Sequence, residues 1–161
     1  MKFLINLKGL VFLMNDEYYM KEALLEAEMA LSKDEVPVGC VIVKDGEIIA
    51  RSHNLKEFHQ DVTSHAEINA IKIASSILGS WRLDGCSIYV NVEPCLMCLG
   101  AIVSARFDRL IYGVRDKKYE SLDEILNRYL ENFNHQLKVT PGVLSEPSKT
   151  LMQSFFKKLR E

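Results

Sequence analysis

The sequence has no excess of charge of either sign. Among its 161 residues, 20 are Lys or Arg and 22 are Asp or Glu, which gives a formal net charge of −2 at pH 7. A chain with this balance has no global attraction for a polyanion, so a contact with nucleic acid would need a local basic patch. The net charge therefore neither indicates nor excludes RNA as a partner.

Long apolar runs, internal repeats and low-complexity segments are also missing. The stretch MKFLINLKGLVFL at residues 1–13 faintly resembles a signal peptide, but Asn6 and Lys8 interrupt it and no small-residue cleavage site follows. It is too short and polar to span a bilayer, so we expect no membrane association. Three interpretations of this extension stay open: an addition without a role, a start misassigned upstream of Met14, or a segment that packs on the core.

Cysteines are few, and their spacing is uneven. The chain has Cys40, Cys86, Cys95 and Cys98, and only the last two are close together. Such a pair is more typical of a metal or redox site than of a secreted disulfide framework. Because 48% of the residues are hydrophobic, a core can form without cross-links. We expect one domain at residues 14–161, in a reducing cytoplasm.

Helical and strand-like patterns alternate along the rest of the chain. Helices are indicated by apolar residues at helical spacing and by capping residues, and strands by short β-branched runs. This alternation predicts a single α/β layered domain. The predicted elements are a helix capped by Asn15 or Asp16, strands at 38–44 and 47–53 around the turn Asp45-Gly46, a helix at 65–78 capped by Thr63 or Ser64 and ended by Gly79, a strand at 86–92, a helix opened by Pro94, a strand at 109–114, a helix at 122–133, a strand at 137–142, and a helix from Ser145 or Glu146 to Arg160.

Two short stretches, HAE at residues 65–67 and PCLMC at 94–98, together indicate a metal site. Cys95 and Cys98 are three residues apart at a helix start, so their sulfurs can lie on one face and bind one ion. The helix N-terminus also favours the thiolate form of both. His65 can add a neutral imidazole, and two soft thiolates favour zinc over magnesium or calcium.

The remaining cysteines and histidines do not provide an obvious fourth ligand. Cys40 and Cys86 lie inside predicted strands and are interpreted as small buried hydrophobes. His53, His59 and His135 have no second ligand at a suitable spacing. A structural zinc site is usually closed by four protein ligands, whereas a catalytic site keeps one position for water. The sequence therefore favours a catalytic site.

Glu67 is the candidate proton carrier. Two residues on a regular helix point roughly 200° apart when they are separated by two positions, so Glu67 and His65 do not naturally bind the same ion. At the first turn of the helix, however, the carboxylate can reach a water molecule on the metal. Zinc lowers the pKa of such a water towards about 7, and an adjacent carboxylate can take its proton.

The pair HAE and PCLMC resembles the signature of zinc deaminases that act on nucleobases. Five further stretches resemble the bacterial tRNA-specific adenosine deaminase family, and the resemblance covers the chain from about Asp16 onward. These stretches are EYYMKEALLEAEMA, EVPVGCVIV, DVTSHAEINAI, WRLDGCSIYVNVEPCLMCLGAIVSARFDRLIYGVRD and FFKKLR.

The resemblance implies a three-layer α/β/α fold like that of cytidine deaminase, with a mixed, roughly five-stranded sheet, and a homodimer. It implies hydrolytic deamination of adenosine to inosine at the wobble position of a tRNA anticodon. One zinc ion per subunit would be held by His65, Cys95 and Cys98, and Glu67 would carry protons.

The same resemblance implies the residues that meet the substrate. Asn54 matches the asparagine that contacts the flipped base, and Val38 and Val92 match apolar positions around the purine. Pro94 shapes the loop before the cysteines. Arg115 and Asp116 match a loop near the RNA backbone and the nucleotide beside the target.

Two departures from the family pattern stand near the site. Val62 replaces a proline, which affects the rigidity of that loop. The sequence after GVRDKK also continues directly into YESLDEIL, without the Gly/Ala-rich run common at this point, which bears on the identity of the tRNA. Two basic groups can provide the local positive surface, although those of the last helix are equally explained as its solvated face: Arg115, Lys117 and Lys118, and Lys157, Lys158 and Arg160.

Two alternatives remain. A deaminase of a free base or nucleoside, of the guanine or cytosine type, would share the metal site and need no basic surface. A catalytically inactive partner subunit or a structural zinc module that binds RNA would not need a carboxylate at Glu67, and a closed structural module would need a fourth protein ligand.

Overall fold

The computed structural model describes residues 3–5, 11–13, 15–116 and 122–161. Its centre is a mixed five-stranded sheet with the order β4-β3-β5-β6-β7. Strand β3 is antiparallel to β4 and β5, whereas β5, β6 and β7 are parallel. The strands are β3 (Gly39–Lys44), β4 (Glu47–His53), β5 (Cys86–Val92), β6 (Arg109–Val114) and β7 (Lys138–Thr140).

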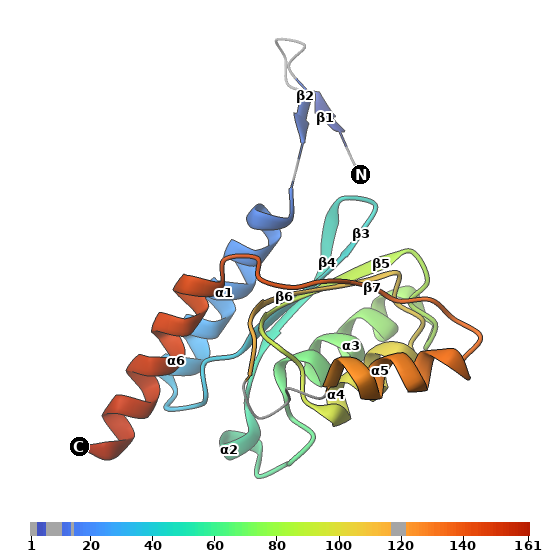
Figure 1. The fold of residues 1–161 in the computed structure, drawn as a ribbon. Helices are drawn as coiled ribbons and strands as arrows, with labels where there is room; N and C mark the ends of the chain where they lie inside the picture. The colour runs from blue at the N-terminus through green and yellow to red at the C-terminus, as the bar shows by residue number, and fades with distance from the viewer. Residues whose placement is uncertain (1–2, 6–10, 14, 117–121) are drawn as a thin grey trace.

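Helices cover both faces of this sheet, so the predicted three-layer α/β/α architecture is confirmed (Figure 1). Helices α1 and α6 lie on one face, and α3, α4 and α5 lie on the other (Figure 1). The short helix α2 follows β4. The helices are α1 (Asp16–Ser32), α2 (Lys56–His59), α3 (Ala66–Leu78), α4 (Leu96–Ser104), α5 (Leu122–Glu131) and α6 (Ser145–Arg160).

Alternation of side chains along the buried strands builds two cores, one on each face. On the α1 face, Val41, Tyr89 and Ile111 pack with Met20 and other residues of α1. On the opposite face, the alternate strand residues pack against α3 and α4, and these include Cys40, Ile42, Ile88, Val90, Leu110 and Tyr112. Cys40 and Cys86 are both fully buried in this second core, in agreement with their interpretation as small hydrophobes.

The strand directions bring the candidate site residues to one edge of the sheet. The carboxyl ends of the parallel strands β5 and β6 lie there, and Val92 pairs with Val114. Because β3 is antiparallel to β5 and β4 is antiparallel to β3, the start of β3 and the end of β4 reach the same edge, where Gly39 pairs with His53. Segments far apart in the sequence thereby meet at one place.

Several local predictions are confirmed. Asn15 caps α1, since its side chain accepts a hydrogen bond of 3.0 Å from the backbone N–H of Tyr18. Asp45 and Gly46 form the hairpin turn with positive φ angles of 51° and 77°. Gly79 ends α3 with a φ of 62°.

The predicted starts of the two site helices are wrong by one or two residues. His65, not Thr63 or Ser64, occupies the cap position of α3, and α4 begins at Leu96, two residues after Pro94. The hydroxyl of Thr63 instead donates to Asp61 at 2.7 Å. Ser64 Oγ likewise bonds to side chains, those of His59 and Asn69, and so neither hydroxyl caps the helix. Helix α2 was not predicted.

The N-terminal extension contains a small antiparallel sheet of its own, β1 (Phe3–Ile5) and β2 (Val11–Leu13). This hairpin lies beyond the start of α1, away from the five-stranded sheet (Figure 1). Met14, the alternative start, is outside the described residues, and the domain boundary there stays a prediction. No helix in the described ranges is long and apolar enough to cross a membrane.

Candidate active site

The starts of α3 and α4 bring one imidazole and two thiols together. His65 and Cys95 are the residues that immediately precede the two helices, and Cys98 lies in the first turn of α4. His65 Nδ1 is 3.5 Å from Cys98 Sγ and 3.7 Å from Cys95 Sγ, and all three candidate ligand atoms lie within 4.8 Å of one another. Both helix N-termini point their unpaired N–H groups at this place, which favours anionic sulfur.

The geometry of this group fits a tetrahedral metal ion. Zinc bonds of about 2.3 Å to sulfur and about 2.0 Å to nitrogen, at tetrahedral angles, separate the sulfur and nitrogen atoms by about 3.5 Å. The observed separations of 3.5 and 3.7 Å match that value. Within the described residues no further His, Cys, Asp or Glu joins the group. The donor set is therefore three protein ligands, as expected of an open site.

The pKa values of the two thiols are shifted in opposite directions. A hydrogen bond from Cys98 lowers the pKa of Cys95 to about 4, despite the opposing effect of burial. The same hydrogen bond, together with burial, raises the pKa of Cys98. Hydrogen bonding to Cys95 also raises the pKa of His65. At least one thiolate is thus present at neutral pH, which is the form that binds a soft metal ion.

Glu67 lies beside the ligand group without being part of it. Glu67 is only 3% exposed, and burial raises the pKa of its carboxyl to about 7. A carboxyl that titrates near neutrality can both accept and donate a proton at working pH. Its position therefore suits proton transfer at the metal site.

A cavity of about 290 Å³ opens directly onto these groups. Its lining contains Glu67 and two of the three metal-site residues, His65 and Cys95. Of the residues expected at the substrate, Val38, Asn54, Val92 and Asp116 also line it. Pro94 and Cys98 are not among the lining residues, and Arg115 lines a neighbouring cavity instead.

That neighbouring cavity is larger, about 670 Å³, and lies between the end of β6 and α6. The two cavities share Val92, Asp116, Met152 and Phe156, so they form a continuous depression. The larger one has more basic than acidic side chains in its lining: Arg115, Lys149, Lys157 and Arg160 against Asp116 and Glu161.

Members of both predicted basic groups line the larger cavity. Lys157 and Arg160 of α6 face the larger cavity, whereas Lys158 pairs with Asp34 at 2.7 Å. Arg115 lines the cavity and also bonds to Asp123 at 3.0 Å. Lys117 and Lys118 lie outside the described residues.

Buried polar side chains that the sequence reasoning missed hold the cavity walls. The carboxylate of Glu35 accepts hydrogen bonds from the backbone N–H groups of Glu57 and Phe58 and so fixes the start of α2 to the loop after α1. Asn91 Oδ1 accepts from the backbone N–H of Gly39 at 2.8 Å, and its amide donates to Pro37. A polar Asn inside the apolar run CSIYVNV was the available signal for this contact.

Glu93 fixes the wall on the side of β6. Its carboxylate accepts a hydrogen bond of 3.0 Å from the backbone N–H of Asp116, and burial raises its pKa. This contact ties the loop after β5 to the loop after β6, and both loops carry residues that line the cavity.

Comparison with known proteins identifies the relatives of this chain. The family model of the MafB19-like deaminases matches residues 14–160. A protein of Bacillus subtilis (strain 168) named tRNA-specific adenosine deaminase is 46% identical over 147 residues, which cover 91% of each chain.

Two solved structures bear on the choice between the expected substrates. One, from a study of A-to-I editing by tRNA:A34 deaminases at the wobble position of transfer RNA, is 41% identical, covers 83% of this chain and 98% of its own, and superposes with a TM-score of 0.77. The guanine deaminase of Bacillus subtilis is 32% identical over 91% of this chain and 94% of its own, with a TM-score of 0.62. Sequence identity is higher for the tRNA-editing relative. The fold does not separate the two substrates, since a guanine deaminase from Nitrosomonas europaea, 24% identical, also superposes with a TM-score of 0.77.

Proposed function

The chain belongs to the MafB19-like deaminases and, among them, to the tRNA-specific adenosine deaminases, and from this premise we propose that it converts adenosine to inosine at the wobble position of a tRNA anticodon. The reaction adds water to C6 of the adenine and releases the 6-amino group as ammonia. The observation that carries the proposal is the open His/Cys/Cys group with the buried carboxyl of Glu67 beside it, next to a cavity of about 290 Å³ that His65, Cys95 and Glu67 line.

One zinc ion per subunit would be held by His65, Cys95 and Cys98, and when bound it supplies the reaction with an activated water molecule. Glu67 would accept a proton from the attacking water and deliver it to N1 of the purine, which would make C6 more electrophilic. The carboxylate would then take the proton of the new C6 hydroxyl and deliver it to the amino group, which departs as ammonia while the C6 carbonyl forms. Burial keeps the carboxyl in the pKa range in which both transfers are possible.

The remaining wall residues would position the base. Val38 and Val92 would pack on the purine, and the amide of Asn54 would bond to it. Two hydrogen bonds hold Asn54: its Nδ2 donates to Val36 O at 3.3 Å, and its Oδ1 accepts from the N–H of Lys56 at 3.1 Å. Pro94 would shape the loop that presents Cys95.

The larger cavity supports an RNA substrate over a free base. A free guanine or cytosine would fill the smaller cavity and leave the larger one without a role. When one nucleotide of an RNA loop is flipped into the smaller cavity, by contrast, the neighbouring nucleotides of that loop must lie beside it. Arg115, Asp116 and the cations of α6 would meet those nucleotides, because they line the larger cavity. The free-base alternative is therefore not favoured.

The proposal includes a homodimer in the cytoplasm. Support for the dimer comes from large apolar side chains exposed near the metal ligands, since Phe58 is 75%, Val62 71% and Leu96 51% exposed. The four cysteines are free, as in a reducing compartment. Residues 14–161 would form the deaminase domain.

Incubation of the purified protein with total tRNA, followed by inosine mapping, tests the function. We expect inosine at one anticodon position, and none with a Glu67→Gln control. Ammonia release from guanine, cytidine or adenosine, without inosine in tRNA, would contradict the proposal and support the free-base alternative.

A further inference from the structure

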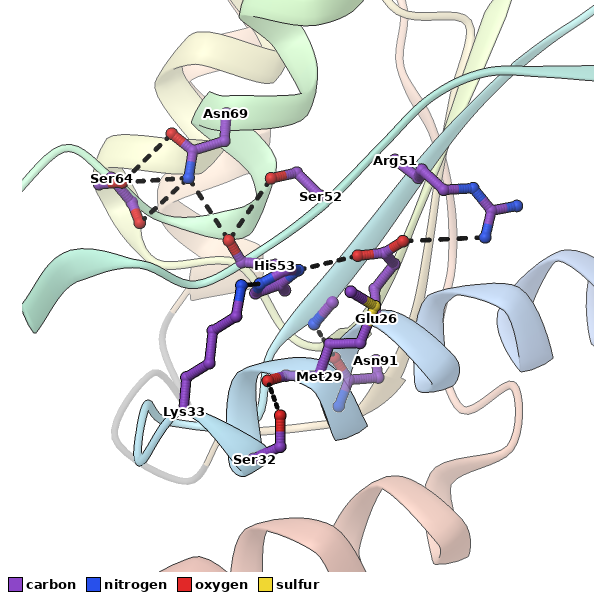
Figure 2. Close-up of polar contacts among 11 residues, drawn as sticks. Glu26, Met29, Ser32, Lys33, Arg51, Ser52, His53, Ser64, Asn69 and Asn91 are labelled. Carbon is purple, nitrogen blue, oxygen red and sulfur yellow. Dashed lines mark hydrogen bonds and ion pairs between the residues drawn. The ribbon is translucent and has the colours of Figure 1, made fainter. Parts of the chain in front are cut away.

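A buried histidine outside the candidate metal group links the central sheet to helix α1. His53, the last residue of β4, is 7% exposed. Figure 2 shows its imidazole between two side chains of the α1 segment. His53 Nδ1 lies 2.9 Å from a carboxylate oxygen of buried Glu26, and His53 Nε2 lies 3.0 Å from Nζ of Lys33. Arg51 lies 3.7 Å from Glu26 and 2.9 Å from Glu22, and completes the set of charged groups around the ring.

These contacts specify one protonation state of the ring. An ammonium group has only hydrogens to offer, so Nε2 must accept from Lys33. The single ring proton is then on Nδ1, which donates to the Glu26 carboxylate. Both ring nitrogens of His53 are therefore engaged, Nε2 as an acceptor and Nδ1 as a donor, and this arrangement fixes the tautomer.

Three walls of the small cavity meet at this residue. Asn54 follows His53 directly and lines the cavity. Lys33 ends α1, and the loop that follows it contributes Val36 and Val38 to the lining. On the other side, the His53 carbonyl oxygen accepts from Asn69 Nδ2 at 3.4 Å, and Asn69 lies one turn after His65 in α3.

Stability alone does not explain such an arrangement. Well-packed apolar residues of similar size commonly stabilise a fold as much as a buried charged network of this kind, or more. What a hydrogen-bonded ring adds is a single geometry, because its donor and acceptor directions are both occupied. Here that geometry relates the end of β4 to the loop after α1 and to α3.

We propose that His53 is a positioning residue for the deamination: through Lys33, Glu26 and Asn69 it holds Asn54 and the facing loop at the distance from Glu67 that the reaction needs. The inference rests on the proposed function, since His53 acts through Asn54. It contacts neither the base nor the metal ligands. Its effect is on the orientation of the bound base, and RNA affinity comes mostly from the rest of the loop.

A double-mutant cycle tests the role. His53→Phe and Lys33→Met are each made in the natural background and with Asn54→Ala, and kcat and KM are measured on an anticodon stem-loop with zinc content determined for every variant. In the natural background we expect His53→Phe to lower kcat by between about tenfold and a hundredfold, as for a small misplacement, with little change in KM. With Asn54→Ala already present, the further loss should stay below about threefold.

The second variant and a matched control keep the result interpretable. Lys33→Met removes only the ammonium from an exposed position, so it should fold and show a smaller loss in the same direction. His135→Phe removes another histidine hydrogen bond, that of its Nε2 to Phe107 O at 2.6 Å, at a place that does not line the cavity. Its effect on kcat should be small, and the same with and without Asn54.

Imidazole nitrogen NMR provides a readout that does not depend on activity. We expect the His53 ring at neutral pH to carry its proton on Nδ1 alone. A doubly protonated ring, or equal kcat losses for His53→Phe in both backgrounds with an active natural enzyme, would overturn the positioning role alone. A natural enzyme that makes no inosine would overturn the proposed function, and the role with it.

Discussion

The two faces of the sheet use buried polar groups in different ways. On the face covered by α1, several buried or half-buried polar side chains bond to one another: Asp16 to Arg109, Tyr89 to Asp16, and Glu26 to His53. On the face covered by α3 and α4, His65, Glu67 and Cys95 turn towards a cavity. On the first face, polar contacts fix how α1 packs on the sheet, whereas on the second face the polar side chains line an open cavity.

The largest effect should follow from loss of a metal ligand. Cys98→Ala removes one of two thiolates from a group of three, and we expect the protein to lose its zinc and all measurable deaminase activity. Because the two apolar cores do not include the metal, the variant should still fold. Zinc analysis and circular dichroism check the two statements, and a variant that keeps stoichiometric zinc would break the assignment of the site.

Glu67→Gln should come next. The amide has nearly the same shape but cannot carry the proton, so we expect a loss of about 10²- to 10⁴-fold in kcat. The zinc content and Tm should stay close to those of the natural protein, because Glu67 is not in the ligand group. Near-normal turnover would refute proton transfer by this residue.

A substitution on the opposite face should affect stability instead. A Cβ atom at Gly39 would collide with the backbone of α1 at Ala23 and Ala27. Because this is backbone and not a flexible side chain, we expect Gly39→Ala to cost about 3 kcal/mol of unfolding free energy.

Gly100→Ala is the matched control for Gly39→Ala. Nothing lies within 4 Å of a Cβ placed there, inside α4, so this substitution should stabilise the protein by about 0.5–1 kcal/mol. Urea denaturation of both variants measures the difference. Equal midpoints would contradict the close contact between β3 and α1.

The smallest effect concerns acid stability. The hydrogen bond from Arg109 lowers the pKa of Asp16 below its usual 3.8, so this pair contributes stability above pH 3.8 that is lost as the pH falls through the lowered pKa. Asp16→Asn keeps an acceptor for Tyr89 and should cost at most about 1 kcal/mol at pH 7, since the pair is partly exposed.

The difference between Asp16→Asn and the natural protein should shrink below pH 3.8, while inosine formation at neutral pH stays unchanged. Denaturation at pH 7 and at acidic pH measures it. A difference that grows in acid would contradict the depressed pKa.

Much of the fold could be predicted because its signals are local. The turn at Asp45-Gly46, the cap at Asn15 and the stop at Gly79 each depend on residues within a few positions. The cap of α3 at His65 was missed because the competing partners of Thr63 and Ser64 could not be recognised from composition. Helix α2 was missed because its four residues contain too little periodicity to detect, and Glu35 fixes its start from another segment.

The sequence by itself determined the candidate metal group: HAE and PCLMC supply the imidazole, the two thiols and the carboxyl beside them, since these depend on residue identity and short spacing. Only the tertiary structure decided how the walls are held. Glu35, Asn91, Glu93 and His53 bond to partners that are 20 to 52 residues away in the sequence. These partners meet only because the strand directions bring four chain segments to one edge of the sheet. A polar residue inside an apolar run indicates that a hydrogen-bond partner is needed, but only the fold determines which residue is that partner.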